Sequence, residues 1–561
     1  MNNSKSKVVA IVVISIAIFI AIAAVAIGVT SSQGGQPGTT SQGDQGNIIQ
    51  GESLESLLKR VTVETATPVK ASVNIVDNSL YDELPDIEKY PLKVEGRGDI
   101  DIEIFTSGEK AGTGNDAWLI DCANSFNNQY NTINGQSVSM SVRSVSSGLA
   151  ADYIISEKYL PDLYTPSNIL FGEFAAVNGG KLEMYTQRLV GNTAGLLVRK
   201  GSGYSTPDAV IDAVMAGKIN IGYTNPQTSA TGLNLLLYIM KRTGDVTNPD
   251  AVDAFARFNN NIPFVAYTTQ QMASSASNGS LDGMTMEYQT YINDSNLQSM
   301  YDFIPFGLRH DNPLYIVDKL GKSADELEAI EMISKYLTSK EMQDIATRYG
   351  FNNNDNHSDS YSVGGSEVTQ ALKTYKTKKD NGKDIIAVFV ADCSGSMAGM
   401  AIQQLKESLS NGMQYINENN YVGLISYSTG VTKEVPIAKF DLNQKAYFQG
   451  AINKLTANGG TQSYEAICVA LDMIEQEKVN HPDAKCMIFL LTDGYANGTM
   501  SMNAIKPAVL RSGVPIYTIG YTDQADMASL KELSSINEAA SINADSEDII
   551  YQIKSLFNAQ L

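Results

Sequence analysis

The stretch Ile385-Ile-Ala-Val-Phe-Val-Ala-Asp-Cys-Ser-Gly-Ser-Met397 decides the fold of the C-terminal part of this chain. Its apolar first part, 385–391, is typical of a buried strand. The run stops at Asp392-x-Ser394-x-Ser396, and a helical pattern follows. One carboxylate and two hydroxyls at the end of a buried strand bring hard oxygen ligands to one point. Such a point suits Mg²⁺, Mn²⁺ or Ca²⁺ rather than a soft metal.

Apolar runs and amphipathic stretches continue to alternate from residue 384 to 561. Strands are predicted at 385–391, 421–427, 487–491, 514–520 and 539–542, and helices at 402–415, 444–455, 464–475, 504–511, 527–533 and 546–557. Short strands joined by crossover helices predict a doubly wound, mostly parallel, Rossmann-like sheet. Ligands of such sheets bind beyond the carboxyl ends of the strands, where both Asp392 and Asp493 are expected.

Two further segments extend the oxygen ligands of the first. They are Gly459-Gly-Thr461 and Thr492-Asp493-Gly494. A hard divalent ion takes about six oxygen ligands, so five protein oxygens leave room for water or an incoming ligand. The sequence therefore predicts a metal site, whose residues are Asp392, Ser394, Ser396, Thr461 and Asp493.

These three segments, in this order and on this strand–helix background, resemble the metal-ion-dependent adhesion site of von Willebrand factor A-type domains. The resemblance covers residues 384–561. It implies that the two serines and the threonine ligate the metal, directly or through water, and that the two aspartates do the same. It also implies metal-mediated protein binding, in which an acidic side chain of the partner protein becomes the last ligand.

A catalytic role for the serines finds no support in the sequence. Ser396 stands one position too early for a G-x-S-x-G nucleophile motif. His481 is expected at the opposite end of its strand from Asp493, so a Ser–His pair is not predicted. The chain also lacks a G-x-x-x-x-G-K-[ST] loop. We therefore predict a binding protein and not an enzyme.

Residues 99–351 also alternate between strand and helix patterns, which predicts a second α/β domain. Small polar residues follow four predicted strand ends, at 106–108, 144–148, 224–232 and 287–288. Hydroxyls and free N–H groups at helix N-termini form a cradle for an anion or a small polar solute. At any single position they are equally explained as helix caps. The residues predicted to line a cleft are Ser107, Ser146, Ser147, Thr228 and Tyr288.

This region resembles the type 2 extracellular solute-binding proteins, the two-lobed class that includes molybdate- and sulfate-binding receptors. The segments that carry the resemblance are Ser146–Gly148, Pro161-Asp-Leu-Tyr164, Gly222-Tyr-Thr-Asn-Pro226 and the closing stretch 336–351. The resemblance implies that a second lobe is inserted between about Gly195 and Asp302, with two crossing strands as the hinge.

The N-terminus carries an uncharged, almost wholly apolar run at 8–29. These residues are about 22 in number and would form a helix of roughly 33 Å, long enough to span a bilayer. Lys5 and Lys7 precede the run, and no basic residue follows until Lys59, so the rest of the chain is predicted outside the cell membrane. Two interpretations stay open, an uncleaved signal-anchor and a signal peptide cleaved after Ala24-Val-Ala26.

The predicted organisation follows from these segments and the polar stretches between them. It comprises a membrane helix (1–29), a Gly/Ser/Thr/Gln stalk (30–51), an irregular arm (52–98), the solute-binding domain (99–351), a linker (352–383) and the A-type domain (384–561). The formal net charge of −20 argues against a nucleic-acid partner, which would need a basic face. The four cysteines show no C-x-x-C spacing and are expected as free thiols.

Two functions fit these predictions. The first is a bacterial, membrane-anchored binding protein outside the cytoplasm, with a metal-dependent protein-interaction module and a module for a small polar solute or oxyanion. The second is the substrate-binding receptor of an ABC-type transport system, in which the A-type domain serves for docking.

Overall fold

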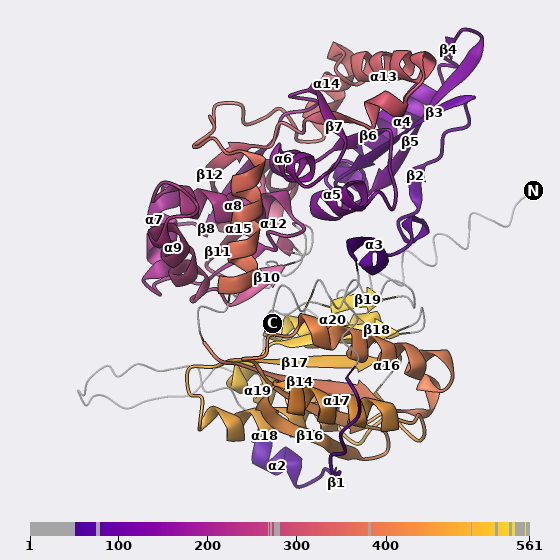
Figure 1. The fold of residues 1–561 in the computed structure, drawn as a ribbon. Helices are drawn as coiled ribbons and strands as arrows, with labels where there is room; N and C mark the ends of the chain where they lie inside the picture. Colours follow the sequence, from indigo (N-terminus) through magenta and orange to yellow (C-terminus); the bar gives the residue numbers. More distant parts are fainter. Residues whose placement is uncertain are drawn as a thin grey trace, which may run out of the picture. The chain divides into compact units, whose positions relative to one another are not determined.

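A computed structural model describes residues 51–544 apart from 74–78, 267–268, 270–271, 274–280, 380–382, 495, 522–524 and 538–540, together with Leu556. The apolar run 8–29 lies outside the described residues, and so does the helix predicted at 546–557 apart from Leu556. Within the described part of the chain, no helix is both long enough and apolar enough to cross a membrane. The described strands form three sheets, with helices packed on them (Figure 1).

The C-terminal domain is built on a seven-stranded sheet in the order β1-β16-β15-β14-β17-β18-β19. The strands are β1 (Val63–Thr65), β14 (Ile385–Asp392), β15 (Tyr421–Tyr427), β16 (Val431–Lys439), β17 (Lys485–Thr492), β18 (Ile516–Tyr521) and β19 (Ser541–Ala544). Every neighbouring pair is parallel except β15 and β16. The predicted α/β class is thereby confirmed. Strand β16 escaped prediction because its charged residues and Pro436 hide its alternation.

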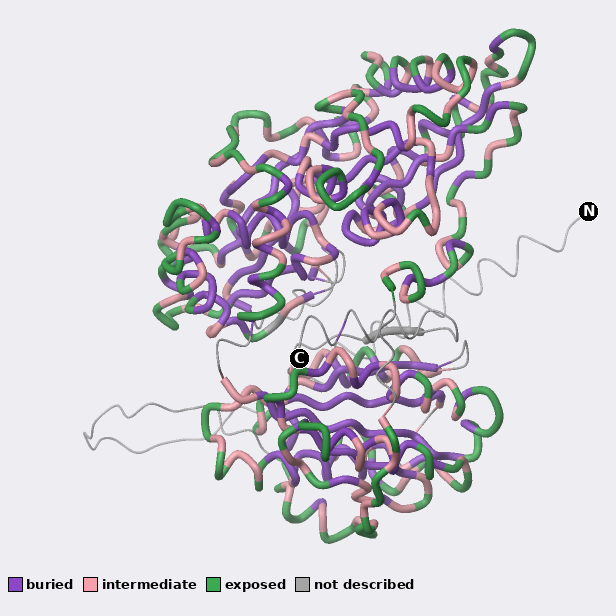
Figure 2. Tube along the Cα trace, in the orientation of Figure 1, coloured by how far each residue is buried: buried purple, intermediate pink, exposed green. Residues whose placement is uncertain are grey.

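The central strand β14 is buried along its whole length because helices cover both faces of the sheet. Its alternate side chains enter two separate hydrophobic clusters, Phe389 with its odd-numbered neighbours in one and Val388 with its even-numbered neighbours in the other. This explains the continuous apolar run, since a strand buried on both faces does not alternate. Figure 2 shows the buried strands at the centre of this domain. Its helices are α16 (Met400–Gly412), α17 (Leu442–Lys454), α18 (Ser463–Lys478), α19 (Met502–Ser512) and α20 (Met527–Ser535).

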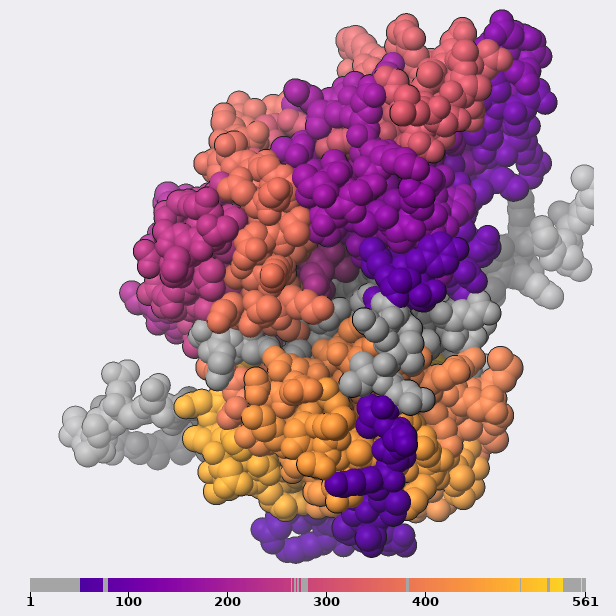
Figure 3. Space-filling view, in the orientation of Figure 1, coloured from indigo at the N-terminus to yellow at the C-terminus, as the bar shows by residue number. Residues whose placement is uncertain are grey.

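The segment after residue 50 begins this domain, although the sequence predicted an irregular arm at 52–98. Helix α2 (Leu54–Leu58) packs on α18, and β1 pairs in parallel with β16 at the edge of the sheet. Figure 3 shows this indigo segment against the orange and yellow domain. All three side chains of β1 are exposed, so its sequence carries no hydrophobic pattern. The domain that contains the other two sheets is therefore inserted into the chain of the C-terminal domain.

Leu57→Ala should destabilise the C-terminal domain by about 2–5 kcal/mol, the usual cost of emptying a fully buried leucine site. Leu57 has no exposed surface and packs in the cluster that contains Val388 and Ile488. Hydrogen exchange of the β14 amides measures the loss. The control Leu442→Ala, at a leucine that is 65% exposed in the same domain, should change little. Equal exchange rates in the two variants would contradict the assignment of α2 to this domain.

The two-lobed domain, residues 79–379, contains the other two sheets. The sheet of lobe one runs β2-β5-β3-β6-β13-β7 with β4 paired to β5, and the sheet of lobe two runs β10-β9-β11-β8-β12. Their strands are β2 (Leu92–Val94), β3 (Ile100–Thr106), β4 (Thr132–Ile133), β5 (Gln136–Ser144), β6 (Leu163–Thr165), β7 (Leu182–Thr186), β8 (Thr193–Arg199), β9 (Ile221–Thr224), β10 (Phe264–Ala266), β11 (Gly283–Glu287), β12 (Tyr301–Arg309) and β13 (Leu314–Val317). The chain enters lobe two through β8 and leaves it through β12, and these two strands pair with each other.

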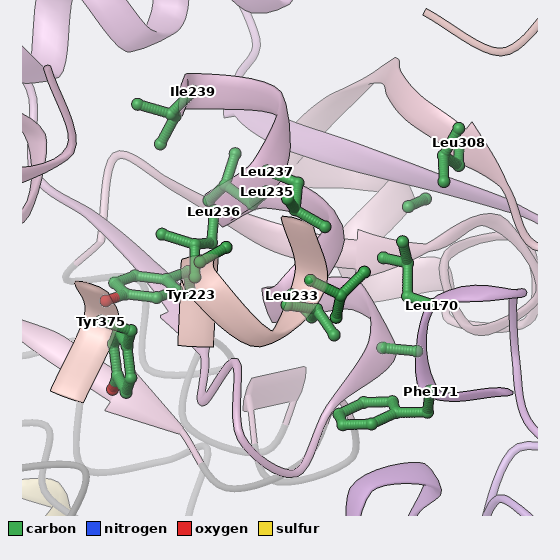
Figure 4. Close-up of a cluster of buried hydrophobic side chains, with 14 of the residues drawn as sticks. Leu170, Phe171, Tyr223, Leu233, Leu235, Leu236, Leu237, Ile239, Leu308 and Tyr375 are labelled. Carbon is green, nitrogen blue, oxygen red and sulfur yellow. The ribbon is translucent and has the colours of Figure 1, made fainter. Parts of the chain in front are cut away.

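Helices cover the sheets of both lobes. They are α3 (Leu80–Glu83), α4 (Trp118–Asn127), α5 (Ser147–Ser156), α6 (Leu170–Val177), α7 (Pro207–Met215), α8 (Ala230–Lys241), α9 (Pro249–Asn259), α11 (Tyr288–Asn293), α12 (Ser295–Met300), α13 (Ala324–Leu337), α14 (Lys340–Arg348) and α15 (Gly365–Lys378). Helix α15 belongs to the stretch expected as a linker, yet it packs on α6, α8 and α9. Figure 4 shows its Tyr375 beside Tyr223 and the leucines of α8. Its buried residues Val368, Ala371 and Tyr375 recur at helical spacing, which explains the packing.

Candidate functional sites

The predicted metal residues gather at the carboxyl edge of the seven-stranded sheet. Asp392 ends β14 and Asp493 directly follows β17, the parallel neighbour of β14, so both carboxylates lie at one edge. Asp392 is fully buried, and its two oxygens accept three hydrogen bonds. The donors are Ser394 N–H (2.8 Å), Thr492 Oγ1 (2.6 Å) and Tyr427 OH (3.1 Å). These bonds fix the turn that follows β14.

A chain of short oxygen–oxygen contacts joins the serines to the second carboxylate. Ser394 Oγ lies 3.0 Å from Ser396 Oγ, and Ser396 Oγ donates to Asp493 Oδ1 at 2.8 Å. We refer to Asp392, Ser394, Ser396, Thr461 and Asp493 as the oxygen cluster. Hydrogen bonds thus join Asp392, Ser394 and Ser396 to one another and to Asp493.

Thr461 reaches the same edge through its loop. Gly395 N–H donates to Gly459 O at 3.0 Å, which ties the loop to the serine turn. Gly459 has a φ of +76°, a left-handed conformation that disfavours side chains. Asn497 then clamps Thr461, since its Oδ1 accepts Thr461 N–H at 2.7 Å and its N–H donates to Thr461 O at 2.9 Å. Asn497 was not predicted, because nothing in its local sequence indicates this contact.

The electrostatics of the oxygen cluster favour a cation. Burial raises the pKa of Asp392, the charge of Asp493 raises it further, and hydrogen bonds from Thr492 and Ser394 oppose the rise. Burial also raises the pKa of Asp493. The hydrogen bonds that these two carboxylates accept come from neutral donors, the hydroxyls of Thr492, Tyr427 and Ser396 and the N–H group of Ser394. Two buried carboxylates with neighbouring hydroxyls fit a hard divalent ion, which would supply the missing positive charge.

In the described part of the chain, no group of three or more His, Cys, Asp or Glu side chains could hold a metal ion. The oxygen cluster has only two carboxylates, so any metal there depends on the hydroxyls of Ser394, Ser396 and Thr461. The four cysteines are free thiols, and three of them are buried. This agrees with the sequence expectation for the cysteines.

A cavity of about 40 Å³ lies between the lobes of the two-lobed domain. Its lining residues are Ser107, Gly108, Glu109, Ser146, Ser147, Ser167, Thr228, Ser229, Ala230, Thr269 and Glu287. Four of the five predicted cleft residues are among them. Tyr288 is not, because its ring packs on Phe303 and Tyr291, with centroids 5.0 and 6.1 Å away.

The two lobes touch beside this cavity. Gly148 N–H of lobe one donates to Thr228 O of lobe two at 3.1 Å. A Cβ atom at Gly148 would lie only 2.1 Å from Gln227 O, so only glycine permits this approach. The two lobes therefore meet at one side of a small, partly open pocket.

Two buried glutamates line the cavity, and sequence analysis predicted neither. Glu109 directly follows the Ser107-Gly108 turn, in which Ser107 is the predicted cleft residue. Glu287 directly precedes Tyr288, the residue predicted at that strand end. A glutamate at a strand end is usually solvated, so only the packing of the lobes reveals that Glu109 and Glu287 are 4% and 2% exposed.

Sequence comparisons divide the chain in the same way as the structure. Residues 387–558 match the family model described as von Willebrand factor type A domain, and residues 111–352 match the one described as bacterial extracellular solute-binding protein. The chain thus combines a region similar to A-type domains with a region similar to solute-binding proteins.

Curated relatives match about 30% of the chain. A von Willebrand factor A domain-containing protein of Dictyostelium discoideum is 28% identical over 176 residues, 30% of this chain and 18% of that protein. Inter-alpha-trypsin inhibitor heavy chain H4 of Homo sapiens is 30% identical over 178 residues, 29% of this chain and 19% of that protein. The match therefore spans less than a fifth of the length of either relative.

Solved structures match parts of the chain. A von Willebrand factor type A protein from Catenulispora acidiphila covers 31% of this chain and 42% of its own, at 18% identity and a TM-score of 0.29. A periplasmic thiamin binding protein covers 51% and 98%, at 12% identity and a TM-score of 0.37. The sulfate-binding protein SubI from Mycobacterium tuberculosis covers 50% and 91%, at 16% identity and a TM-score of 0.34.

Proposed function

We propose that this chain is a non-catalytic binding protein, anchored in the cell membrane with its bulk outside the cytoplasm. The C-terminal domain would bind a partner protein through a divalent metal ion, and the two-lobed domain would bind a small solute. The observation that carries the proposal is the oxygen cluster, in which two buried carboxylates and adjacent hydroxyls meet at one sheet edge. Anchoring rests on the uncharged run 8–29, preceded by Lys5 and Lys7.

The residues that would hold the metal are Asp392, Ser394, Ser396, Thr461 and Asp493. A bound Mg²⁺, or Mn²⁺ or Ca²⁺, offers an acidic side chain of the partner a coordination position. The protein itself holds the ligands in place. Thr492 and Tyr427 orient the Asp392 carboxylate, and Asn497 orients the Thr461 loop.

A second candidate function is favoured by the polar cleft between the lobes. Two lobes that meet over a polar cavity can trap a solute, as the substrate-binding receptor of an ABC-type transport system must. In that case the C-terminal domain would dock the receptor to its partner proteins. Tight solute binding by the purified chain supports this function, and its absence leaves only the metal-dependent interaction.

Mg²⁺ or Mn²⁺ should stabilise the C-terminal domain and leave the other domain unchanged. The purified full chain is compared in Mg²⁺ and in EDTA by hydrogen exchange of the peptides that contain 392–397 and 459–461. Exchange there should slow in Mg²⁺, because the ion neutralises two buried carboxylates and links three loops. The single tryptophan of the chain, Trp118, lies buried in lobe one, so its fluorescence reports the two-lobed domain as an internal control.

Identical exchange in Mg²⁺ and EDTA would overturn the metal site. If the metal binds, the partner is tested by retaining proteins on the immobilised chain in Mg²⁺ and eluting with EDTA. An Asp493→Ala matrix should retain none of the metal-dependent proteins. Retention that is equal on both matrices would refute metal-mediated binding.

A further inference from the structure

Glu109 uses three of the hydrogen-bond donors beside the cleft. Its Oε1 accepts hydrogen bonds from Ser107 Oγ at 2.5 Å, Ser167 Oγ at 2.7 Å and Lys110 Nζ at 3.0 Å. Burial would raise the pKa of Glu109, but the Lys110 charge and the two serine hydroxyls outweigh it and lower the pKa to about 2. Glu109 and Lys110 therefore form a buried pair without net charge.

Glu287, on the same cavity, is held by neutral donors. Asn192 Nδ2 donates to its Oε2 at 2.7 Å, and Thr231 Oγ1 donates to its Oε1 at 2.9 Å. The Asn192 amide cannot be reversed, because its Oδ1 accepts the N–H groups of Thr193 and Gln289. These contacts stabilise a carboxylate and do not neutralise its charge.

His310 is the third group on Glu287, with Nδ1 3.1 Å from Oε1. Asn168 fixes its tautomer. Asn168 Oδ1 accepts Leu170 N–H at 3.0 Å, which turns its Nδ2 donor toward His310 Nε2 at 2.9 Å. Nε2 is then an acceptor, and the ring carries its proton on Nδ1 and donates it to Glu287. A neutral imidazole leaves the cavity with the uncompensated negative charge of Glu287.

The N-termini of α5 and α8 also reach this cavity, and their partial positive charges favour an anion. Glu287 already supplies negative charge at that place, whereas the charge of Glu109 is balanced by Lys110. An anion in the cavity would therefore meet the Glu287 carboxylate, which is unfavourable.

Two hydroxyls of the cleft face the ligand as acceptors, because Ser107 and Ser167 donate their protons to Glu109. These two oxygens then have only lone pairs to offer. Ser146 Oγ is buried on the same cavity without a hydrogen-bond partner. A ligand that brings hydrogen-bond donors therefore finds acceptors at Ser107, Ser167 and Glu287.

We propose that the cleft binds a small cation with N–H donors, a protonated amine, and not an oxyanion. The inference rests on the proposed solute-binding function and assigns its substrate class. A volume of about 40 Å³ holds only a few water-sized groups, which suits an ammonium head group. Within the described residues no set of three or more His, Cys, Asp or Glu could ligate a metal, so a metal cation fits this cleft less well.

The test measures binding of five probes to the purified full chain, by calorimetry and by the thermal transition of Trp118 fluorescence. The probes are methylammonium, tetramethylammonium, sulfate, molybdate and Mg²⁺. Methylammonium should bind and raise the transition temperature. Tetramethylammonium carries the charge without N–H donors and should bind at least tenfold more weakly. Sulfate and molybdate should not bind.

Glu287→Gln should weaken methylammonium binding at least tenfold, because it removes the uncompensated charge and nearly keeps the side-chain shape. Its urea midpoint without ligand, followed by Trp118, verifies that the domain is folded. The control Glu328→Gln removes an exposed carboxylate of the same domain and should bind as the wild type does.

Each other outcome overturns the inference in a distinguishable way. Binding of sulfate or molybdate, especially if Glu287→Gln strengthens it, refutes the amine and keeps the solute-binding function. Equal binding of tetramethylammonium refutes the need for N–H donors. A shift of the Trp118 transition by Mg²⁺ that Glu287→Gln removes points to a metal cleft. If no probe binds, the amine assignment fails, whereas the solute-binding function fails only if larger polar solutes also leave the Trp118 transition unchanged.

Discussion

Asp493→Ala should abolish the response of the C-terminal domain to Mg²⁺. The substitution removes one of two carboxylates in the oxygen cluster, and the remaining ligands carry a single negative charge for a divalent ion. The domain should still fold, because Asp493 bonds only Ser396 within the cluster, and burial already disfavours its charged form. Hydrogen exchange of residues 392–397 should then be the same in Mg²⁺ and in EDTA.

The matched control is Asp483→Ala, which removes an exposed aspartate of the same domain and should keep the full Mg²⁺ response. Ser396→Ala provides an independent variant, since it keeps both carboxylates and removes the hydroxyl that joins Ser394 to Asp493. It should weaken the response without abolishing it. A normal Mg²⁺ response in Asp493→Ala would show that the ion binds elsewhere.

Lys110→Met should destabilise the two-lobed domain by about 3–5 kcal/mol, because it leaves the Glu109 carboxylate buried without its counter-charge. Lys110 has no exposed surface, and its Nζ also bonds Ser107 and Asn312, both at 2.6 Å. Urea unfolding followed by Trp118 fluorescence measures the loss, since this tryptophan belongs to lobe one of the same domain.

The double variant Lys110→Met, Glu109→Gln should recover a large part of this stability, because it removes the stranded charge together with its partner. The control is Lys340→Met in α14, whose ion pair with Asp344 is exposed and should contribute less than about 1 kcal/mol. If the double variant is as unstable as Lys110→Met alone, packing and not charge explains the loss.

The oxygen cluster could be predicted because its signals are local. Each of its residues directly follows an apolar run or belongs to a glycine-rich turn, and the order of the sheet brings the strand ends together. The hydroxyls of the cleft were predictable for the same reason. Ser107 and Ser146 follow strand ends and precede helices, where polar side chains have a structural role in any α/β fold.

Charge in the cleft could not be predicted, because it depends on which side chains become buried together. Glu109 reads as a surface residue in the sequence, and Glu287 is buried only because lobe two packs Asn192 and His310 around it. Their contacts join residues up to 95 positions apart. No local pattern carries such information.

The sequence alone determined the class of each domain and the residues of the oxygen cluster, because a strand buried on both faces leaves a continuous apolar run and the cluster residues directly follow such runs or lie in a glycine-rich turn. Only the tertiary structure decided that Val63–Thr65 completes the sheet of the C-terminal domain and that two carboxylates line the cleft. Strand β1 is held by backbone hydrogen bonds, which any side chains permit. The charge of the cleft is set by long-range packing, which hides a carboxylate from water only once both lobes are folded.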